Sequence, residues 1–184
     1  MPGRVVLLHG TSSSGKTTVA RAVQNLSDEP WVHLGIDTFW NAIDERWMEH
    51  GTRASEGFLW MEDATIVPGP VGQRLAAGMR AALAAFARAD NDVLVDDVFI
   101  EPAWLDGWRV ELVDVEWLLV GVVAPLHVLE EREVARGNRI AGEARAQTDL
   151  IHHGIEYDLI VDTSRQSPEE CALSILAAIG VLTE

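Results

Sequence analysis

Cysteine is almost absent from this chain of 184 residues. Cys171 is its one cysteine, so no intramolecular disulfide can form. Because Cys171 falls in a predicted helix, we interpret it as a small core residue and not as a nucleophile. Stability must then come from an apolar core, and this length suits a single domain over residues 1–184.

Positive charge is scarce as well. The chain has 14 basic and 29 acidic residues, which gives a formal net charge of −15. A nucleic-acid binder needs a basic face to neutralise phosphates, so this balance argues against nucleic acid and against anionic membranes as partners. A nucleotide can still bind, because local arginine and lysine side chains matter more than the total charge.

Long apolar runs are also missing. None approaches the roughly 18 residues that a membrane span requires. A predicted strand begins at residue 4, without the charged and apolar regions of a signal peptide before it. We therefore expect a cytoplasmic protein, and the composition leaves its oligomeric state open.

Lysine occurs once, and its position is informative. Lys16 lies in the stretch Gly10-Thr11-Ser12-Ser13-Ser14-Gly15-Lys16-Thr17, which fits the phosphate-binding pattern G-x-x-x-x-G-K-[ST]. An apolar run at 4–9 predicts a buried strand before this loop, and the apolar residues of 18–26 share one helical face after it. The alternative is a Ser/Gly turn that happens to start a helix, and it does not account for the lone lysine.

Each residue type in this loop matches a part of phosphate binding. Gly10 and Gly15 allow a tight turn that presents backbone N–H groups to phosphate oxygens, and the helix N-terminus adds partial positive charge. Lys16 would reach the β- and γ-phosphates, and the Thr17 hydroxyl would ligate Mg²⁺. The predicted nucleotide-binding residues are Gly10, Thr11, Ser12, Ser13, Ser14, Gly15, Lys16, Thr17 and Thr18.

Predicted strands and helices alternate along the rest of the chain. Near-continuous apolar strands that alternate with helices predict an α/β fold of three layers, with a five-stranded parallel sheet and helices on both faces. An apolar stripe on the longest helix is interpreted as core packing. The predicted strands are 4–9, 31–36, 92–99, 115–123 and 159–162, the later helices are 70–88, 101–112, 125–135, 143–153 and one from 168, and the stripe is Val71, Leu75, Met79, Leu83 and Phe86.

Three aspartates follow predicted strands. Asp96 and Asp97 close the strand at 92–99, where a carboxylate can hold Mg²⁺ directly or through water; Asp96 is assigned to the metal and Asp97 to the substrate side. Asp37 follows the strand at 31–36, at the edge where open α/β sheets form their active crevice, and can accept the proton of an attacking hydroxyl. The alternative for all three is a helix cap.

Arginines cluster after the predicted helix at 125–135. Arg132, Arg136 and Arg139 predict a lid over residues 132–145 that closes on ATP, neutralises transferring charge and excludes water. The alternative is a solvated charged face, because three glutamates interleave with these arginines. The adjacent histidines at 152–153 have no further metal ligands at suitable spacing, so we interpret them as ordinary surface or helix-end residues.

The stretch 44–70 is difficult to assign, and it could be a long substrate loop or a pair of short helices. It belongs to the predicted substrate-covering segment, 38–70. Trp40, Trp47 and Trp60 lie there and would provide flat walls for an aromatic ligand, with Trp40 and Trp60 as the candidate substrate contacts. Carboxylates outnumber arginines in this segment, which favours a neutral or cationic acceptor over an anionic one.

Five motifs, taken in order, carry a resemblance to a known family. They are GTSSSGKT at 10–17, GIDTFW at 35–40, VLVDDVF at 93–99, EREVARGNRIAG at 131–142 and HHGIEYDLIVDT at 152–163. Together they resemble the chloramphenicol phosphotransferases and their relatives. The resemblance implies the P-loop small-molecule kinase fold, similar to shikimate and adenylate kinases, and phosphate transfer from ATP to a primary hydroxyl.

The resemblance also implies residue roles. Asp37 matches the proposed base, Lys16 and Thr17 match the phosphate and Mg²⁺ residues, and Arg136 and Arg139 match the lid. The predicted function is an ATP- and Mg²⁺-dependent phosphotransferase acting on a small hydroxylated, aromatic molecule, with chloramphenicol the first to try. A kinase of another metabolite or nucleotide, and a nucleotide-dependent switch without an acceptor, are the alternatives.

Overall fold

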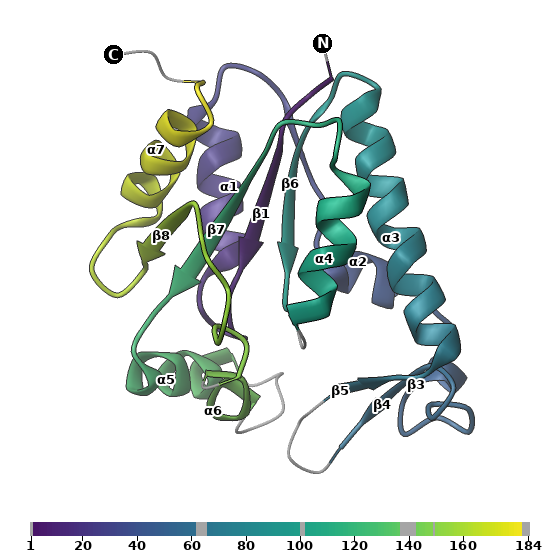
Figure 1. Ribbon diagram of the computed structural model, residues 1–184. Coiled ribbons are helices and arrows are strands. Elements are labelled where there is room, and N and C mark those ends of the chain that lie inside the picture. The colour runs from purple at the N-terminus through teal and green to yellow at the C-terminus, as the bar shows by residue number, and fades with distance from the viewer. Residues whose placement is uncertain (1, 62–65, 100–101, 137–142, 149, 182–184) are drawn as a thin grey trace.

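A five-stranded parallel sheet forms the centre of the protein (Figure 1). The computed structural model describes residues 2–61, 66–99, 102–136, 143–148 and 150–181. All strand pairs of this sheet are parallel, and the strand order is β2-β6-β1-β7-β8. The strands are β1 (Val5–His9), β2 (Trp31–His33), β6 (Asp92–Asp97), β7 (Trp117–Val123) and β8 (Leu159–Asp162). The predicted fold class is confirmed.

Helices cover both faces of this sheet (Figure 1). Side chains alternate along β1, so Val5 and Leu7 pack in the cluster under α3 and α4, while Val6 and Leu8 pack in the cluster under α1 and α7. All four are fully buried. The helices are α1 (Lys16–Leu26), α2 (Ile36–Trp40), α3 (Pro70–Arg88), α4 (Pro102–Glu111), α5 (Leu126–Arg136), α6 (Glu143–Thr148) and α7 (Pro168–Ala178).

The long helix α3 has the predicted bounds and part of the predicted buried face. Phe86 is 43% exposed, while Met79 and Leu83 are buried as expected. A Cβ on Gly72 would lie 2.3 Å from the Gly57 carbonyl oxygen, so small residues bring this helix close to neighbouring backbone. The buried residues of α3 are Gly72, Ala76, Met79, Leu83, Ala84 and Ala87. Close packing by small residues thus turns the expected stripe partly toward solvent.

The stretch 44–70 is neither of the two structures that we expected. It forms a short 3-10 helix η1 (Glu45–Trp47) and a small second sheet of β3 (Met48–Glu49), β4 (Phe58–Trp60) and β5 (Ile66–Pro68), in the order β3-β4-β5. Strands of two or three residues are too short to show a sequence period. This small sheet lies beyond the carboxyl ends of the central strands, beside the N-terminal end of α3 (Figure 1).

Some element ends also differ from the prediction. Strand β2 ends at His33 instead of residue 36, and α6 ends at Thr148 instead of 153. The last helix is confirmed: Ser167 caps α7 in a reciprocal capping box with Glu170, and Cys171 is buried within it.

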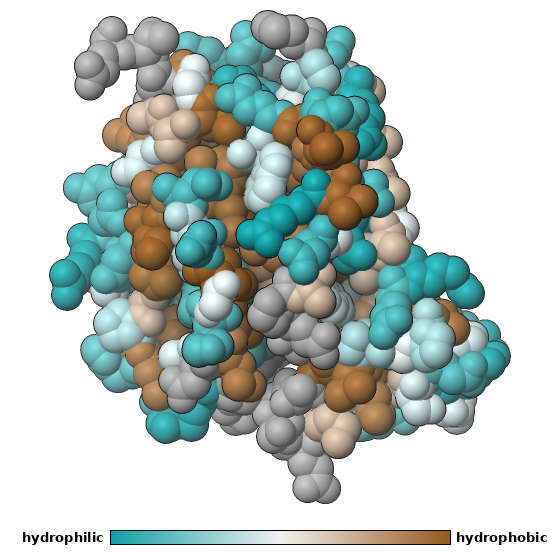
Figure 2. Space-filling view, viewed as in Figure 1, coloured by the Kyte–Doolittle hydropathy of each residue, from teal (hydrophilic) through white to brown (hydrophobic). Residues whose placement is uncertain are grey.

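Among the described residues, no helix is long and apolar enough to cross a membrane. Apolar side chains are interrupted by hydrophilic ones across the face in Figure 2.

Candidate phosphate-transfer site

The loop after β1 has the backbone of a phosphate-binding loop. Gly15 has φ 97° and Ser13 has φ 63°, so two residues in the left-handed region turn the chain into α1. A Cβ on Gly10 would lie 2.3 Å from the Val122 carbonyl oxygen, so only glycine lets the loop pass this close to β7. The glycines of the motif are thus required by local geometry at both ends of the loop.

The lysine of this loop folds back over it. The Lys16 Nζ donates hydrogen bonds to the carbonyl oxygens of Gly10 and Thr11, each at 2.8 Å. These bonds hold the ammonium above the loop and away from both core clusters. The position of the charge suits a phosphate that lies against the loop amides.

A hydroxyl and a carboxylate meet beside the start of α1. The Thr17 Oγ1 donates to Asp96 Oδ2 at 2.8 Å, and His33 Nε2 lies 3.4 Å from Asp96 Oδ1. Burial acts to raise the pKa of Asp96, but the contacts with His33 and Thr17 outweigh it, so the pKa is lowered. Asp96 therefore stays ionised, and two hard oxygen ligands lie together as Mg²⁺ requires. Among the described residues, no group of three or more His, Cys, Asp or Glu side chains forms a separate metal site.

The neighbouring aspartate faces the other side of the sheet. Asp97 is 1% exposed; its Oδ2 accepts a hydrogen bond from Trp108 Nε1 at 3.1 Å, and its Oδ1 accepts one from Val98 N at 2.7 Å. Burial raises the pKa of this carboxyl. Since side chains alternate along β6, only Asp96 lies on the side of Thr17, which favours Asp96 for the metal and gives Asp97 a packing role against α4.

Asp37 lies in the first turn of α2, one residue after the end of the predicted strand at 31–36. Gly35 is the N-cap of this helix, so the alternative that Asp37 caps it is wrong. A Cβ on Gly35 would lie 1.7 Å from Asp96 Oδ1, so glycine is what lets the chain before α2 lie against the Asp96 carboxylate. The backbone thereby carries the exposed Asp37 close to the Thr17–Asp96 pair.

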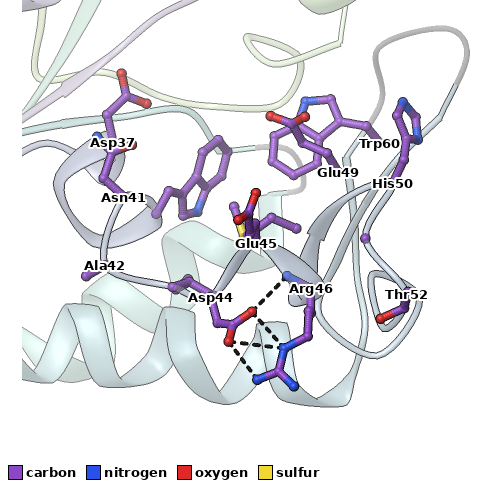
Figure 3. A pocket seen from close by; sticks show the side chains of 14 residues that line it. Asp37, Asn41, Ala42, Asp44, Glu45, Arg46, Glu49, His50, Thr52 and Trp60 are labelled. Atoms are coloured by element: carbon purple, nitrogen blue, oxygen red, sulfur yellow. Dashed lines mark hydrogen bonds and ion pairs between the residues drawn. The ribbon is translucent and has the colours of Figure 1, made fainter.

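A cavity of about 1310 Å³ opens beside Asp37 (Figure 3). The Trp40 and Trp60 rings line it and meet edge to face at 5.2 Å between centroids. Trp47 lies elsewhere, with the Arg53 guanidinium 4.0 Å from its ring centroid. The lining residues are Asp37, Trp40, Asn41, Ala42, Ile43, Asp44, Glu45, Arg46, Met48, Glu49, His50, Gly51, Thr52 and Trp60.

A second cavity, of about 400 Å³, lies on the other side of the loop, between α1, α5 and the turn after β8. Arg132 crosses it: Nη1 donates to Thr163 Oγ1 and Nη2 to the Thr163 carbonyl oxygen, both at 2.9 Å. Its lining residues are Ser13, Gly15, Thr18, Val19, Arg132, Ala135, Thr163, Gln166 and Pro168. Thr163 ends the motif at 152–163 but was given no role there, and Gln166 lies outside all five motifs; both reach this place through the order of strands in the sheet.

The predicted lid lies only partly within the described residues. Arg136 ends α5 and its side chain, like all of Arg139, lies outside them. Glu133 is buried and accepts a hydrogen bond from Ala144 N at 3.0 Å, so not all the interleaving glutamates belong to a solvated face. The following helix α6 also contacts the loop, because Gln147 Oε1 accepts a hydrogen bond from Ser12 N at 2.8 Å.

A partly buried hydrogen-bonded cluster lies beside the loop and was not expected. The Tyr157 hydroxyl lies 2.7 Å from His9 Nδ1 and 2.6 Å from His152 Nδ1, so His152 is not the ordinary surface residue that we predicted. Burial, with the nearby His152 and Lys16, lowers the pKa of His9 to about 3. The imidazole of His9, the residue directly before Gly10, therefore stays neutral at neutral pH. His152 and Tyr157 belong to the motif at 152–163, but nothing in the sequence shows that this motif meets His9, which is why the cluster was not predicted.

The parallel sheet and the phosphate-binding loop together have the fold of the P-loop kinases. The sequence matches the family described as chloramphenicol phosphotransferase-like protein over residues 3–180, so the chain belongs to this family. A Mycobacterium tuberculosis protein with the provisional name O-phosphotransferase is 34% identical over an alignment of 183 positions, which covers 92% of this chain and 79% of that protein.

Solved structures of kinases share the fold at low sequence identity. An unliganded sugar kinase from Janibacter sp. HTCC2649 has a TM-score of 0.67 and 20% identity, with all of both chains covered. The APS kinase of Mycobacterium tuberculosis, in complex with AMPPNP and APS, has a TM-score of 0.65 and 20% identity, covering 97% of this chain and 98% of that one. At these identities the likeness concerns the fold alone.

Proposed function

We propose that this protein transfers the γ-phosphate of ATP to a hydroxyl of a small, largely apolar molecule with an aromatic ring. The observation that carries the proposal is the position of Asp37. It lines a cavity walled by two indole rings, and it follows by two residues the glycine that packs on Asp96. An acceptor in this cavity would lie between a carboxylate base and the phosphate-binding loop.

The second cavity supports the placement of the nucleotide. The loop amides and Lys16 would hold the phosphates, while the space between α1 and Arg132 would receive the base or the ribose. Its volume of about 400 Å³ suits a group of that size. The contact of Gln147 with Ser12 N would then give way to a phosphate oxygen.

The Thr17–Asp96 pair fits a magnesium ion. Its ligands would be the Thr17 hydroxyl and the Asp96 carboxylate, directly or through water. When bound, the ion would neutralise negative charge on the phosphate oxygens. Asp96 would have to exchange its hydrogen bond with Thr17 for this role, and its lowered pKa keeps it ionised for that purpose.

The residues of the chain supply the remaining parts of the reaction. Asp37 would take the proton of the acceptor hydroxyl as its oxygen bonds to the γ-phosphorus, while the bond from that phosphorus to the bridging oxygen breaks and ADP leaves. Lys16 and the loop amides would stabilise the charge that develops on the transferring group. Arg132, and Arg136 and Arg139 by the family resemblance, would add positive charge from the lid side.

Product analysis with a panel of alcohols tests this function. The protein is incubated with Mg-ATP and chloramphenicol, other neutral aryl alcohols, nucleoside monophosphates or shikimate-like acids, and the product masses are followed. Transfer to an aryl alcohol, lost in Asp37→Asn, supports the proposal. Transfer to the anionic panel alone would favour a metabolite kinase, and ATP hydrolysis that no alcohol stimulates would favour a nucleotide-dependent switch.

A further inference from the structure

The charged groups that line the cavity beside Asp37 are nearly all acidic. Four carboxylates line it, from Asp37, Asp44, Glu45 and Glu49, against the one guanidinium of Arg46. Arg46 is committed to Asp44: its Nε lies 2.9 Å from Oδ1, its Nη2 lies 2.7 Å from Oδ2, and the pKa of Asp44 falls to about 2. That ion pair cancels, and three carboxylates still face the cavity.

These three carboxylates share a direction. In Figure 3 the carboxylates of Asp37, Glu45 and Glu49 point toward the upper side of the view, whereas Asp44 turns down to Arg46. Within the described part of the chain, the Glu45 and Glu49 side chains have no hydrogen-bond or ion-pair partner. The acidic side chains are therefore placed to meet a group outside the chain itself.

The aromatic walls point the same way, independently of the charges. Trp40 and Trp60 meet edge to face and both line the cavity, so a ligand in it would lie against indole surface. An indole face carries negative quadrupole density and attracts a cation within about 6 Å of its centroid. Rings and carboxylates together form the surroundings in which proteins bind organic ammonium groups.

We propose that the acceptor carries a protonated amine as well as its hydroxyl, so that the substrate class is the aryl amino alcohols. The hydroxyl faces Asp37, the ring or apolar body lies against Trp40 and Trp60, and the ammonium lies within reach of Glu45 and Glu49. This inference rests on the proposed function and narrows its acceptor. A neutral alcohol makes only the ring contacts, and an anionic one is repelled by the carboxylates.

Three acceptors built on one scaffold test the charge preference. They are 2-amino-1-(4-nitrophenyl)-1,3-propanediol, its N-acetyl amide and its N-succinyl amide, which share the ring and both hydroxyls and differ at the nitrogen, where they carry an ammonium, an uncharged acyl group or an acyl group with a carboxylate. We expect the KM of the amine to be about ten-fold below that of the acetyl amide, from two exposed ion pairs worth a few-fold each. The succinyl amide should be the poorest acceptor, and added salt should reduce the preference.

Matched variants assign the preference to the two glutamates. The double variant E45Q/E49Q keeps the size of both side chains, and its amine-to-amide KM ratio should move to near one, with the change in KM and not in kcat. E29Q removes an exposed carboxylate beside Arg4, at the opposite end of the sheet, and should leave the ratio unchanged. Circular dichroism and Tm confirm that each variant is folded.

Calorimetric Kd values for the same compounds separate the two proposals. An amine that binds about ten-fold tighter than its amide supports the cationic acceptor whether or not it is phosphorylated. Equal Kd and KM values for amine and amide, or a preference that E45Q/E49Q retains, overturn it. Failure of every alcohol to become phosphorylated, with a preserved preference in binding, contradicts only the proposed function.

Discussion

The two sides of the site differ in how their polar side chains are held. On the phosphate side, Lys16, Thr17 and Arg132 already make hydrogen bonds within the protein, to loop carbonyls, to Asp96 and to Thr163. On the acceptor side, the carboxylates of Glu45 and Glu49 are exposed and have no partner within the described residues.

Under the proposed function, this difference separates chemistry from selectivity. The residues proposed to act on the phosphate, Lys16, Thr17 and Arg132, are half-buried, and a misplaced charge costs more there than in solvent. The residues proposed to select the acceptor, Glu45 and Glu49, lie on a 3-10 helix and a short strand outside the central sheet. Substitutions on the acceptor side should therefore disturb the central sheet less.

The largest expected effect comes from the phosphate side. Lys16→Ala should reduce phosphate transfer to background. The fold should be retained, because the Lys16 side chain donates hydrogen bonds to loop carbonyl oxygens and belongs to neither core cluster. The measurements are turnover, far-UV circular dichroism and Tm, with Arg21→Ala, an exposed charge on the same helix, as the control. A Lys16→Ala protein that is still active would remove the basis of the phosphate-loop assignment.

The next effect tests Asp37, the proposed base, which lies between the acceptor cavity and the phosphate side. Asp37→Asn should lower kcat by about 10²–10⁴-fold, the usual contribution of a general base, with ATP affinity retained. Asp37 is exposed and is not the cap of α2, so the change should leave Tm nearly unaltered. Single-turnover rates and nucleotide Kd values check this. Unchanged turnover of the best acceptor would exclude Asp37 as the base.

A smaller effect tests the close approach of Gly35, in the segment that leads to Asp37, to the Asp96 carboxylate. Gly35→Ala would place a methyl group 1.7 Å from Asp96 Oδ1. We expect a loss of about 1–3 kcal/mol in unfolding free energy, because Asp96 or α2 must move. Turnover should also fall, because this movement changes the Thr17–Asp96 geometry. Gly78→Ala is the matched control, because nothing lies within 4 Å of its added Cβ, and it should be neutral or stabilising. Equal unfolding curves for both variants would contradict the close approach.

The effect that is smallest at neutral pH concerns the partly buried cluster beside the loop, and it grows as the pH falls. The pKa of His9 is about 3 in the folded protein and about 6.5 in the unfolded chain, so below pH 6.5 the unfolded state binds the additional proton. Stability should fall by up to about 1.4 kcal/mol per pH unit between pH 6.5 and 3, and the contribution is fully present above pH 6.5. Urea unfolding between pH 7 and 4 should show a smaller slope for His9→Gln. His127→Gln, at an exposed position, is the control, and a slope that His9→Gln shares with wild type would count against the assignment.

Patterns of residues predicted the phosphate side well and the acceptor side poorly. The loop at 10–17, its flanking strand and helix, and the capped helix from Pro168 follow from local spacing, which short-range physics determines. Strands as short as Met48–Glu49 and Phe58–Trp60 have no period to detect. Their place is set by contacts between distant segments, such as Gly69 N with the Gly57 carbonyl oxygen at 2.7 Å.

Several single residues near the site were not predicted from the sequence, for the same reason. His9 is far in sequence from Tyr157, and Ser12 is far from Gln147, so each pair meets only after the strands of the sheet are ordered. The opposite directions of Asp96 and Asp97 could have been derived from the alternation along a strand, but only once it was known which face α1 covers. The Thr163 contact with Arg132 depends on β8 lying at the edge beside β7.

The scarcity of lysine has a practical consequence. Lys16 carries the only side-chain primary amine in the chain, and its Nζ lies on the carbonyl oxygens of the phosphate loop. An amine-reactive reagent therefore has a single side-chain target, which a bound phosphate would shield. Covalent labelling followed by intact-mass analysis would report the occupancy of the loop as one mass increment, without a radioactive nucleotide or an introduced probe.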